Sequence, residues 1–433
     1  MRYTLNHAEL FTANRQRLKT LLPPNALVLL LSNDVYPRSA DGHYPFRQDP
    51  DLFYLTGIDQ EDTYLLLYPD CPREDLREVL FLRRTSETIA IWEGPRLTQS
   101  EACARSGIKT IKWNDEFDSI VNIVMCYAEQ VFLNLNEHDR LVNEVPYRSL
   151  RFARALQDRF PLHQYRRLAP LMHQLRSIKM PQELELIKKA IAITEKAFRR
   201  VLQFIRPGVM EYEIEAEITH EFLRNGASGH AYQPIIASGK NACILHYINN
   251  NQPCRDGELV LMDFGAEYAN YVADLSRTVP VNGRFTPRQR EVYDAVLRVM
   301  RQAKNLLRPG TNLHEYNTKL VGQIMEEELL KLGLLKTEEV KNQDPENPAY
   351  KKYFMHGTSH YLGLDVHDVG SRFATIQPGM VFTCEPGIYI PEEGFGIRLE
   401  NNILVTEDEP VDLMAGIPIE AEEIEALMAA RPS

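Results

Sequence analysis

The second half of the chain repeats one order of elements, and this repeat constrains the fold more than any other feature. The tripeptide Arg-Pro-Gly occurs at 206–208 and again at 308–310, each time after a long amphipathic stretch. Each tripeptide is followed by another amphipathic stretch that closes on glycine, and then by an acidic, strand-like segment. Proline and glycine end helices. We therefore predict the order helix, turn, helix and hairpin twice, with a period of about 100 residues, in a domain with pseudo-twofold internal symmetry.

The first acidic segment, residues 259–278, holds two aspartates that a hairpin would bring together. Asp263 and Asp274 each follow an apolar run, and they lie equally far from the bond between Tyr268 and Ala269. A hairpin centred on that bond places the two aspartates directly opposite each other, with Cβ atoms roughly 5 Å apart. Like charges at that separation repel. A divalent cation offsets the repulsion, because hard and borderline metals bind carboxylate oxygen.

The second acidic segment, residues 381–405, repeats this arrangement. Glu385 and Glu400 lie equally far from the bond between Glu392 and Glu393, which falls in the predicted turn. The same reasoning places these two glutamates opposite each other. A cluster of histidines lies between the two predicted hairpins: His356, His360 and His367.

Four carboxylates and a histidine offer more donors than one tetrahedral site needs, so two divalent ions fit the set better than one. Two such ions share a water, lower its pKa toward neutrality and polarise a carbonyl, which is the chemistry of a two-metal hydrolase. The alternative is that the carboxylates lie on solvated surface hairpins and hold no ion.

His246 lies in an apolar run that ends in asparagines. The sequence leaves two alternatives for this histidine, namely the wall of a substrate pocket and a structural role.

Residues 1 to about 172 have a different pattern, in which helical and strand-like stretches alternate. Residues 7–22 and 147–160 have helical periodicity, whereas short apolar runs bounded by turn or charged residues predict strands. The predicted strands are 26–32, 63–69, 78–84, 88–94 and 130–136. Such alternation favours an α/β domain with a mixed sheet. The chain contains neither a G-x-x-x-x-G-K-[ST] loop nor a G-x-G-x-x-G turn between strand and helix, which argues against nucleotide binding.

Composition excludes several classes of function. The length of 433 residues suits two or three domains, and a net charge of −11 without a basic stripe argues against nucleic-acid binding. The six cysteines are scattered without a C-x-x-C pair, as is typical of reduced thiols in a cytosolic protein. The sequence shows neither a secretory h-region nor an apolar run of about 18 residues, so we predict a cytoplasmic protein without a membrane span.

Several motifs of the second half resemble the creatinase/methionine-aminopeptidase family, whose catalytic domain has the "pita-bread" fold. They read ILHY, LMDFGAEYANYVADLSRT, HGTSHYLGLDVHD, EPGIYI and GIRLENN. In the first half, RSADGHYPFRQDPDLFYLTG and IWEGPRL are similar to the proline-specific branch, the Xaa-Pro aminopeptidases (aminopeptidase P). The resemblance covers nearly the whole chain. It implies an α/β N-terminal domain with a mixed sheet (1–173) and an α+β pita-bread catalytic domain with a pseudo-twofold repeat (174–433).

The resemblance also implies roles for individual residues. Those that match the metal ligands are Asp263, Asp274, His360, Glu385 and Glu400, with Asp274 and Glu400 as the bridging carboxylates. The catalytic positions are His246, His356, His367, Glu385 and Arg398, where Glu385 shuttles the proton of the water and Arg398 orients a ligand carboxylate. The substrate-binding positions are Tyr232, Tyr389 and Trp92. In this family the residue that Trp92 matches reaches a neighbouring subunit; the alternative for Trp92 is an ordinary core aromatic.

The function that the resemblance implies is release of the N-terminal residue from peptides with proline in second position. Attack on the Xaa-Pro carbonyl would come from a water activated by two divalent ions, with Mn²⁺ favoured and Co²⁺, Zn²⁺ or Fe²⁺ as alternatives. The implied assembly is a homodimer or homotetramer. A prolidase, which cuts Xaa-Pro dipeptides, would carry the same ligands and is the nearest alternative. Creatinases share the fold but lack the metal ligands, so the presence of all five matching residues argues against creatinase activity. A third alternative is an inactive pita-bread protein that serves as a binding module.

Overall fold

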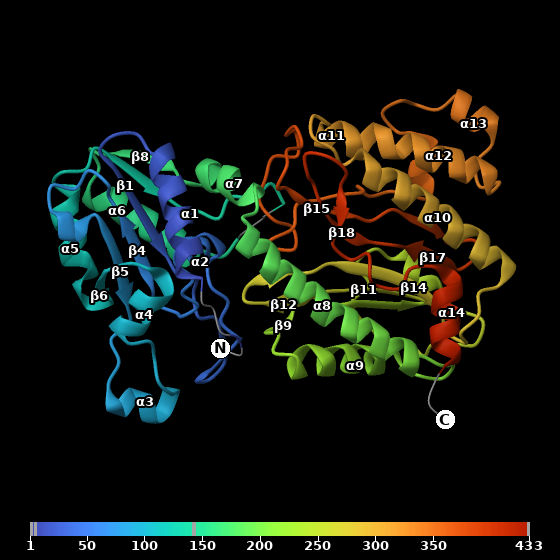
Figure 1. The fold of residues 1–433 in the computed structure, drawn as a ribbon, viewed down its shortest axis with the longest axis horizontal. Coiled ribbons are helices and arrows are strands. Elements are labelled where there is room, and N and C mark those ends of the chain that lie inside the picture. Colours follow the sequence, from blue (N-terminus) through green and yellow to red (C-terminus); the bar gives the residue numbers. More distant parts are fainter. Residues whose placement is uncertain (1–2, 4–6, 141–143, 431–433) are drawn as a thin grey trace. The chain divides into compact units, whose positions relative to one another are not determined.

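The computed structural model describes Tyr3 and residues 7–140 and 144–430, and the chain folds as two compact units that meet in sequence between Arg176 and Ser177 (Figure 1). Most of the extreme N-terminus, on which the expected lack of a secretory signal depends, lies outside the described residues. Within the described ranges, the helices lack the combination of length and apolar character that crossing a bilayer requires.

The N-terminal unit is built on a mixed six-stranded sheet with the strand order β6-β5-β4-β1-β7-β8, as the sequence predicts. The bounds of these strands, in chain order, are β1 (Ala26–Leu31), β4 (Tyr64–Leu67), β5 (Glu78–Leu82), β6 (Thr110–Trp113), β7 (Gln130–Leu133) and β8 (Gln164–Arg167). The central strand β1 pairs antiparallel with β4 and parallel with β7. All six of its residues are buried, because side chains pack on both faces of the sheet.

Most helices of this unit cover the sheet, whereas α3 (Glu87–Glu93) and a short exposed hairpin of β2 (Pro37–Ser39) and β3 (Gly42–His43) extend from it. The helices are α1 (Ala8–Leu21), α2 (Pro50–Thr56), α3 (Glu87–Glu93), α4 (Gln99–Ser106), α5 (Phe117–Met125), α6 (Arg148–Arg159) and α7 (Ala169–Ser177). The core on one face of the sheet joins strand residues such as Leu29 and Phe81 to Phe117 and Val121 of α5.

The strand predicted at 88–94 is wrong, because this segment forms helix α3. Ser86 caps the helix by accepting a hydrogen bond from the Ile89 amide at 3.2 Å, and Gly94 ends it with a φ of 80°. A short apolar run does not distinguish a strand from a helix. The apolar side chains of this segment are not packed in a core, since Ile91 and Trp92 are 81% and 85% exposed. The interpretation of Trp92 as a core aromatic is therefore wrong as well.

The motif FRQDPDLFYLTG of the N-terminal unit places a buried carboxylate at the start of α2. One oxygen of Asp49 accepts a hydrogen bond from the Leu52 amide at 2.9 Å, whereas its Oδ2 is buried without a hydrogen-bond partner. Burial, and then the neighbouring charge of Asp51, raise the pKa of Asp49 to about 7. Above that pH the folded unit therefore holds a buried charge that the Leu52 amide and the charge of Arg176 offset only in part.

We expect Asp49→Asn to stabilise the N-terminal unit by about 1–3 kcal/mol at pH 8. Because the folded pKa lies above the unfolded value, the folded wild-type unit takes up a proton as the pH falls from about 7 toward 4, and its stability rises over that window. Asparagine keeps the helix cap and removes the titration. Urea unfolding followed by tryptophan fluorescence measures the effect, because both tryptophans, Trp92 and Trp113, belong to this unit.

Asp158→Asn, on the exposed face of α6, is the matched control for that experiment. Equal pH dependence in wild type and Asp49→Asn would contradict the prediction.

The unit that begins at Ser177 confirms the predicted internal repeat. Its first half contains α8 (Pro181–Phe204), α9 (Glu211–Arg224), β9 (Gly229–His230), β10 (Ile235–Ser238), β11 (Leu259–Phe264), β12 (Ala266–Tyr268), β13 (Tyr271–Val272) and β14 (Leu275–Pro280). Its second half contains α10 (Pro287–Leu306), α11 (Leu313–Glu315), α12 (Val321–Lys331), α13 (Thr337–Lys341), β15 (Val381–Cys384), β16 (Gly387–Ile390), β17 (Phe395–Arg398), β18 (Asn401–Leu404), β19 (Val411–Asp412) and α14 (Ala421–Ala429). The strands lie between the helix pair α8 and α9 on one side and α10 and α12 on the other (Figure 1).

The two halves match in detail at the Arg-Pro-Gly turns. Gly208 and Gly310 have φ values of 94° and 91°. After the first turn Met210 forms an isolated antiparallel bridge with Pro253, and after the second Asn312 forms one with Thr375. The bridge partners Pro253 and Thr375 are 122 residues apart, and so are Asp263 and Glu385. The repeat therefore places these two carboxylates at equivalent positions in the two halves.

One irregularity distinguishes the second half. Between α11 and α12 the helix makes a π-helical turn over Tyr316–Leu320, where α9 of the first half is uninterrupted. The polar segment 336–352, which the sequence predicts as an insertion, forms α13 and a 3₁₀ turn at Ala349–Lys352.

Candidate metal centre

The first acidic hairpin has a different register from the predicted one. Asp263 of β11 pairs with Ser276 of β14, so Asp274 lies diagonally across from Asp263 and not directly opposite it. The turn is centred one residue later, on Ala269 and Asn270, whose φ values of 52° and 64° are those of a type I′ turn. The two aspartates still share one face of the hairpin, because the shift moves the pairing by two positions.

The second acidic hairpin has the predicted register. Cys384 pairs with Asn401 and Gly387 pairs with Arg398, so Glu385 and Glu400 lie opposite each other between these pairs. The two hairpins contact each other through polar groups. The side-chain amide of Asn402 donates to the Asp274 carbonyl at 2.7 Å, and its oxygen accepts from the Asp274 amide at 3.2 Å. These contacts fix Asp274 against the second hairpin.

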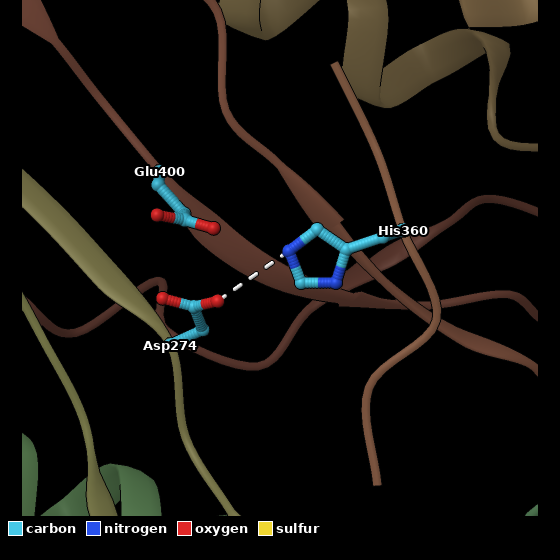
Figure 2. A group of neighbouring side chains, drawn as sticks. All are labelled: Asp274, His360 and Glu400. Carbon is cyan, nitrogen blue, oxygen red and sulfur yellow. Dashed lines mark ion pairs between the residues drawn. The ribbon is translucent and has the colours of Figure 1, made fainter. Parts of the chain in front are cut away.

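Three of the predicted ligands converge in a group that can hold a metal ion. One ligand atom from each of Asp274, His360 and Glu400 lies within 4.8 Å of the others (Figure 2). The Nε2 atom of His360 is 3.5 Å from Asp274 Oδ2 and 3.4 Å from Glu385 Oε1, so Glu385 joins the group through the same nitrogen. Asp263 lies beside Asp274 on the first hairpin.

The orientation of the His360 ring suits a metal ligand. Its Nδ1 lies 3.0 Å from the Tyr361 carbonyl, which can only accept, so Nδ1 carries the proton. The lone pair of Nε2 then faces the carboxylates. Metal-binding histidines typically donate their second ring N–H to a carbonyl or carboxylate in this way. Thr383 adds to the restraint, because its hydroxyl accepts the His360 amide at 3.1 Å.

The carboxylates carry more negative charge than the surrounding protein offsets. Burial, and then the charges of Glu400 and Asp263, raise the pKa of Asp274 well above its usual value. Burial, and then the charge of Glu385, do the same for the pKa of Glu400. The Oε1 atom of Glu400 is buried without a hydrogen-bond partner. A buried carboxylate oxygen without a hydrogen-bond partner, close to other carboxylates, is a suitable ligand for a divalent cation, because Ca²⁺-like and Mg²⁺-like ions bind oxygen donors.

Two side chains hold Asp263. Arg398 Nη2 donates to Asp263 Oδ2 at 2.6 Å, and the Tyr232 hydroxyl lies 2.6 Å from Asp263 Oδ1 and also hydrogen bonds to Asp274 Oδ1. The diagonal placement of the two aspartates leaves room for this hydroxyl between them. Burial and the nearby carboxylates raise the pKa of Tyr232 well above its usual value, so the phenol keeps its proton.

A directed chain of hydrogen bonds leads from Arg398 to His356. Arg398 Nη1 lies 2.9 Å from the Tyr389 hydroxyl, which lies 2.7 Å from His356 Nε2. Because Nδ1 of His356 lies 2.9 Å from the Gly357 carbonyl, Nδ1 carries the proton and Nε2 accepts from Tyr389. Burial, and then the charge of Arg398, lower the pKa of His356 to about 3, so this ring is neutral near pH 7.

The remaining predicted residues lie in different surroundings. The His367 ring packs at 90° against that of His360, with centroids 4.5 Å apart. His246 is exposed and near enough to His356 for its charge to lower the pKa of that ring. Trp92 belongs to the N-terminal unit, where it is exposed on α3.

Sequence reasoning missed the polar residues that support the site. Ser276 donates to Glu400 at 2.8 Å and accepts from Arg398 Nε at 2.8 Å. Asn402 and Thr383 hold Asp274 and His360 as described above. Ser276 and Asn402 lie two residues beyond Asp274 and Glu400, a spacing that places side chains on the same face of an extended chain and that the sequence does show.

Comparisons with known proteins agree with this architecture. The profile of Metallopeptidase family M24 matches residues 185–407, and that of the aminopeptidase P N-terminal domain matches residues 11–132. The Xaa-Pro aminopeptidase of Escherichia coli (strain K12) is 39% identical over 436 residues, which cover 97% of each chain. Human Xaa-Pro aminopeptidase 3 is 34% identical over 98% of this chain and 85% of the human protein.

Solved structures are similar over the whole chain. A putative aminopeptidase P from Bacillus anthracis has a TM-score of 0.90 at 34% identity and covers 98% of both chains. E. coli aminopeptidase P with the inhibitor Pro-Leu has a TM-score of 0.86 at 36% identity over 99% of both chains.

Fold and site together define the class of protein: a metal-dependent hydrolase whose catalytic domain is a pita-bread fold. The sequence similarity extends over both domains and identifies one family within that class. The chain belongs to metallopeptidase family M24 and carries an aminopeptidase P N-terminal domain before the catalytic domain.

Proposed function

We propose that this protein is an aminopeptidase that releases the N-terminal residue of peptides whose second residue is proline. The observation that carries the proposal is similarity over 97% of the chain, through both domains, to a protein named Xaa-Pro aminopeptidase. The E. coli structure with the inhibitor Pro-Leu supports a site that accepts a proline residue. Proline forms a tertiary amide with a fixed φ, and a dedicated pocket suits such a substrate.

The residues proposed to hold two divalent ions are Asp263, Asp274, His360, Glu385 and Glu400. These ions would supply a water of lowered pKa and polarise the scissile carbonyl. We propose Mn²⁺ as the ion, with Co²⁺, Zn²⁺ and Fe²⁺ as alternatives that oxygen and nitrogen donors also accept.

The protein's own side chains would then move protons and orient the substrate. Glu385 is proposed to accept a proton from the water and deliver it to the leaving proline nitrogen. The neutral His356 ring, held by Tyr389, is proposed to contact the substrate together with His246 and His367. Arg398 keeps the Asp263 carboxylate in one orientation through a hydrogen bond of 2.6 Å.

The test is hydrolysis of Xaa-Pro-Yaa tripeptides by metal-free protein to which Mn²⁺, Co²⁺ or Zn²⁺ is added. We expect release of the first residue from Xaa-Pro-Yaa and none from Xaa-Ala-Yaa. Absence of cleavage with every metal would refute the proposal. Cleavage of Xaa-Pro dipeptides alone would identify a prolidase, and a protein that binds none of these metals would identify an inactive binding protein.

We further propose a cytoplasmic homodimer or homotetramer in which Trp92, exposed on α3, contacts a neighbouring subunit. Light scattering on the full chain measures the subunit number, and a monomer in wild type would refute this part.

A further inference from the structure

The loop that carries the candidate histidines begins without regular secondary structure. His356 to His360 form neither helix nor strand, although Thr358 and Ser359 are buried. Buried backbone groups need hydrogen-bond partners, and such a loop must find them outside a ladder or a helix.

One side chain from outside the loop supplies three of these partners. The Oδ1 atom of Asn317 accepts the amides of Thr358 and Ser359, each at 2.8 Å. The Nδ2 atom of Asn317 donates to the Ser359 carbonyl at 3.0 Å. A single side chain therefore holds two backbone donors and one backbone acceptor midway between His356 and His360.

Asn317 lies in the π-helical turn Tyr316–Leu320. Its neighbour Tyr316 also faces the loop, because the Ser359 hydroxyl donates to the Tyr316 hydroxyl at 3.3 Å. π-Helical turns are rare, occur as single turns within α-helices and are frequent at functional sites. In this unit the turn brings two consecutive polar side chains against one loop.

The segment held by Asn317 is joined directly to candidate ligands. The Thr358 carbonyl accepts the amide of Glu385 at 2.8 Å, and the His360 carbonyl accepts the amide of Thr383 at 3.0 Å. A shift of residues 358 and 359 would therefore move His360 and Glu385 relative to each other, and their side chains are only 3.4 Å apart.

We propose that Asn317 is a positioning residue that sets the distance between His360 and Glu385 before a metal binds. This inference rests on the proposed function for its metals but needs no peptide substrate. Residues that orient metal ligands typically change metal affinity or activity by 10–100-fold when they are replaced.

The experiment compares Asn317→Ala with Thr318→Ala in the full-length, metal-free protein. Thr318 is the matched control because it occupies the same π-helical turn, is exposed and uses its hydroxyl only for the His314 carbonyl among the described contacts. Calorimetric titration with Mn²⁺, Co²⁺ or Zn²⁺ alone gives the affinity, and thermal unfolding without metal gives the stability.

We expect Asn317→Ala to weaken binding of each metal that wild type binds by about 10-fold or more, and Thr318→Ala to leave it within about twofold. We also expect added metal to restore part of the peptidase activity of Asn317→Ala. Asn317→Asp keeps the acceptor for both amides and loses the donor, so its affinity should lie between those of wild type and Asn317→Ala; it serves as the test variant if Asn317→Ala does not fold.

A purely structural role gives a different result. If the variants unfold at lower temperature but bind the metals with wild-type affinity below that temperature, the proposal is overturned. A loss of metal affinity in a protein whose wild type cleaves no peptide would instead refute the proposed function and leave the role of Asn317 standing.

Discussion

Glu400→Gln is expected to abolish divalent-metal binding at the candidate centre and to lower peptidase activity by at least ~10³-fold. Glu400 contributes a buried oxygen that has no hydrogen-bond partner in the protein, and a neutral amide would be a weaker ligand for a divalent cation than the carboxylate it replaces. Metal ions contribute several kcal/mol to transition-state stabilisation, and each 1.36 kcal/mol corresponds to about a tenfold change in rate. Calorimetric titration and steady-state kinetics of metal-reconstituted protein measure both losses.

The same substitution is expected to make the metal-free protein more stable, by roughly 1 kcal/mol near neutral pH. Burial and the charge of Glu385 raise the folded pKa of Glu400, so the carboxylate destabilises the fold increasingly as the pH rises. The gain from Glu400→Gln should therefore grow with pH. Glu392→Gln, at the exposed tip of the same hairpin, is the control and should change neither property. Undiminished metal affinity in Glu400→Gln would refute the assignment.

Gly265→Ala is expected to have the second largest effect, because it acts on the backbone between Asp263 and Asp274. A Cβ atom on Gly265 would lie 1.7 Å from the carbonyl oxygen of Ala273 and 2.6 Å from its carbon. These are backbone atoms of the opposing chain, so the hairpin itself must move. We expect a loss of about 3 kcal/mol in unfolding free energy and roughly 100-fold in activity, as is common when catalytic groups move by about 1 Å.

Gly416→Ala is the matched control, because a Cβ atom there meets nothing within 4 Å. Calorimetric unfolding and peptidase assays on both variants measure the difference. Wild-type unfolding temperature and activity in Gly265→Ala would show that the hairpin is not tightly packed at this point.

The sequence predicts the repeat, the mixed sheet and the second hairpin because each depends on local rules. Both Arg-Pro-Gly tripeptides follow the end of a helix, and the Pro-Glu-Glu-Gly sequence at 391–394 forms the turn at the centre of the second hairpin. The predicted centre of the first hairpin is one residue from the observed centre. The observed turn needs a positive φ at Ala269, which is uncommon for alanine and therefore is not predicted from the residue type. That placement depends on the packing of the whole domain.

The supporting polar residues are harder to predict for a different reason. Asn317 lies about 40 residues before the loop it holds, in a stretch whose amphipathic pattern predicts an ordinary helix. Nothing in that pattern indicates a π-helical turn. Helix α3 shows the opposite case, in which an apolar run predicts burial but the folded unit leaves Trp92 in solvent. The π-helical turn and the exposure of Trp92 both depend on how the rest of the unit packs, which a short stretch of sequence does not determine.

The pairing of the two acidic ribbons also limits how their lengths can change. Ten residues separate Asp263 from Asp274, and fourteen separate Glu385 from Glu400. Both intervals are even, and the tips have two residues (269–270) and four residues (391–394), so each ribbon points its two acids toward the same side. Residues can be added to or removed from either tip in twos without turning an acid away, whereas a single inserted residue that shifts the pairing would direct one carboxylate away from the other ligands.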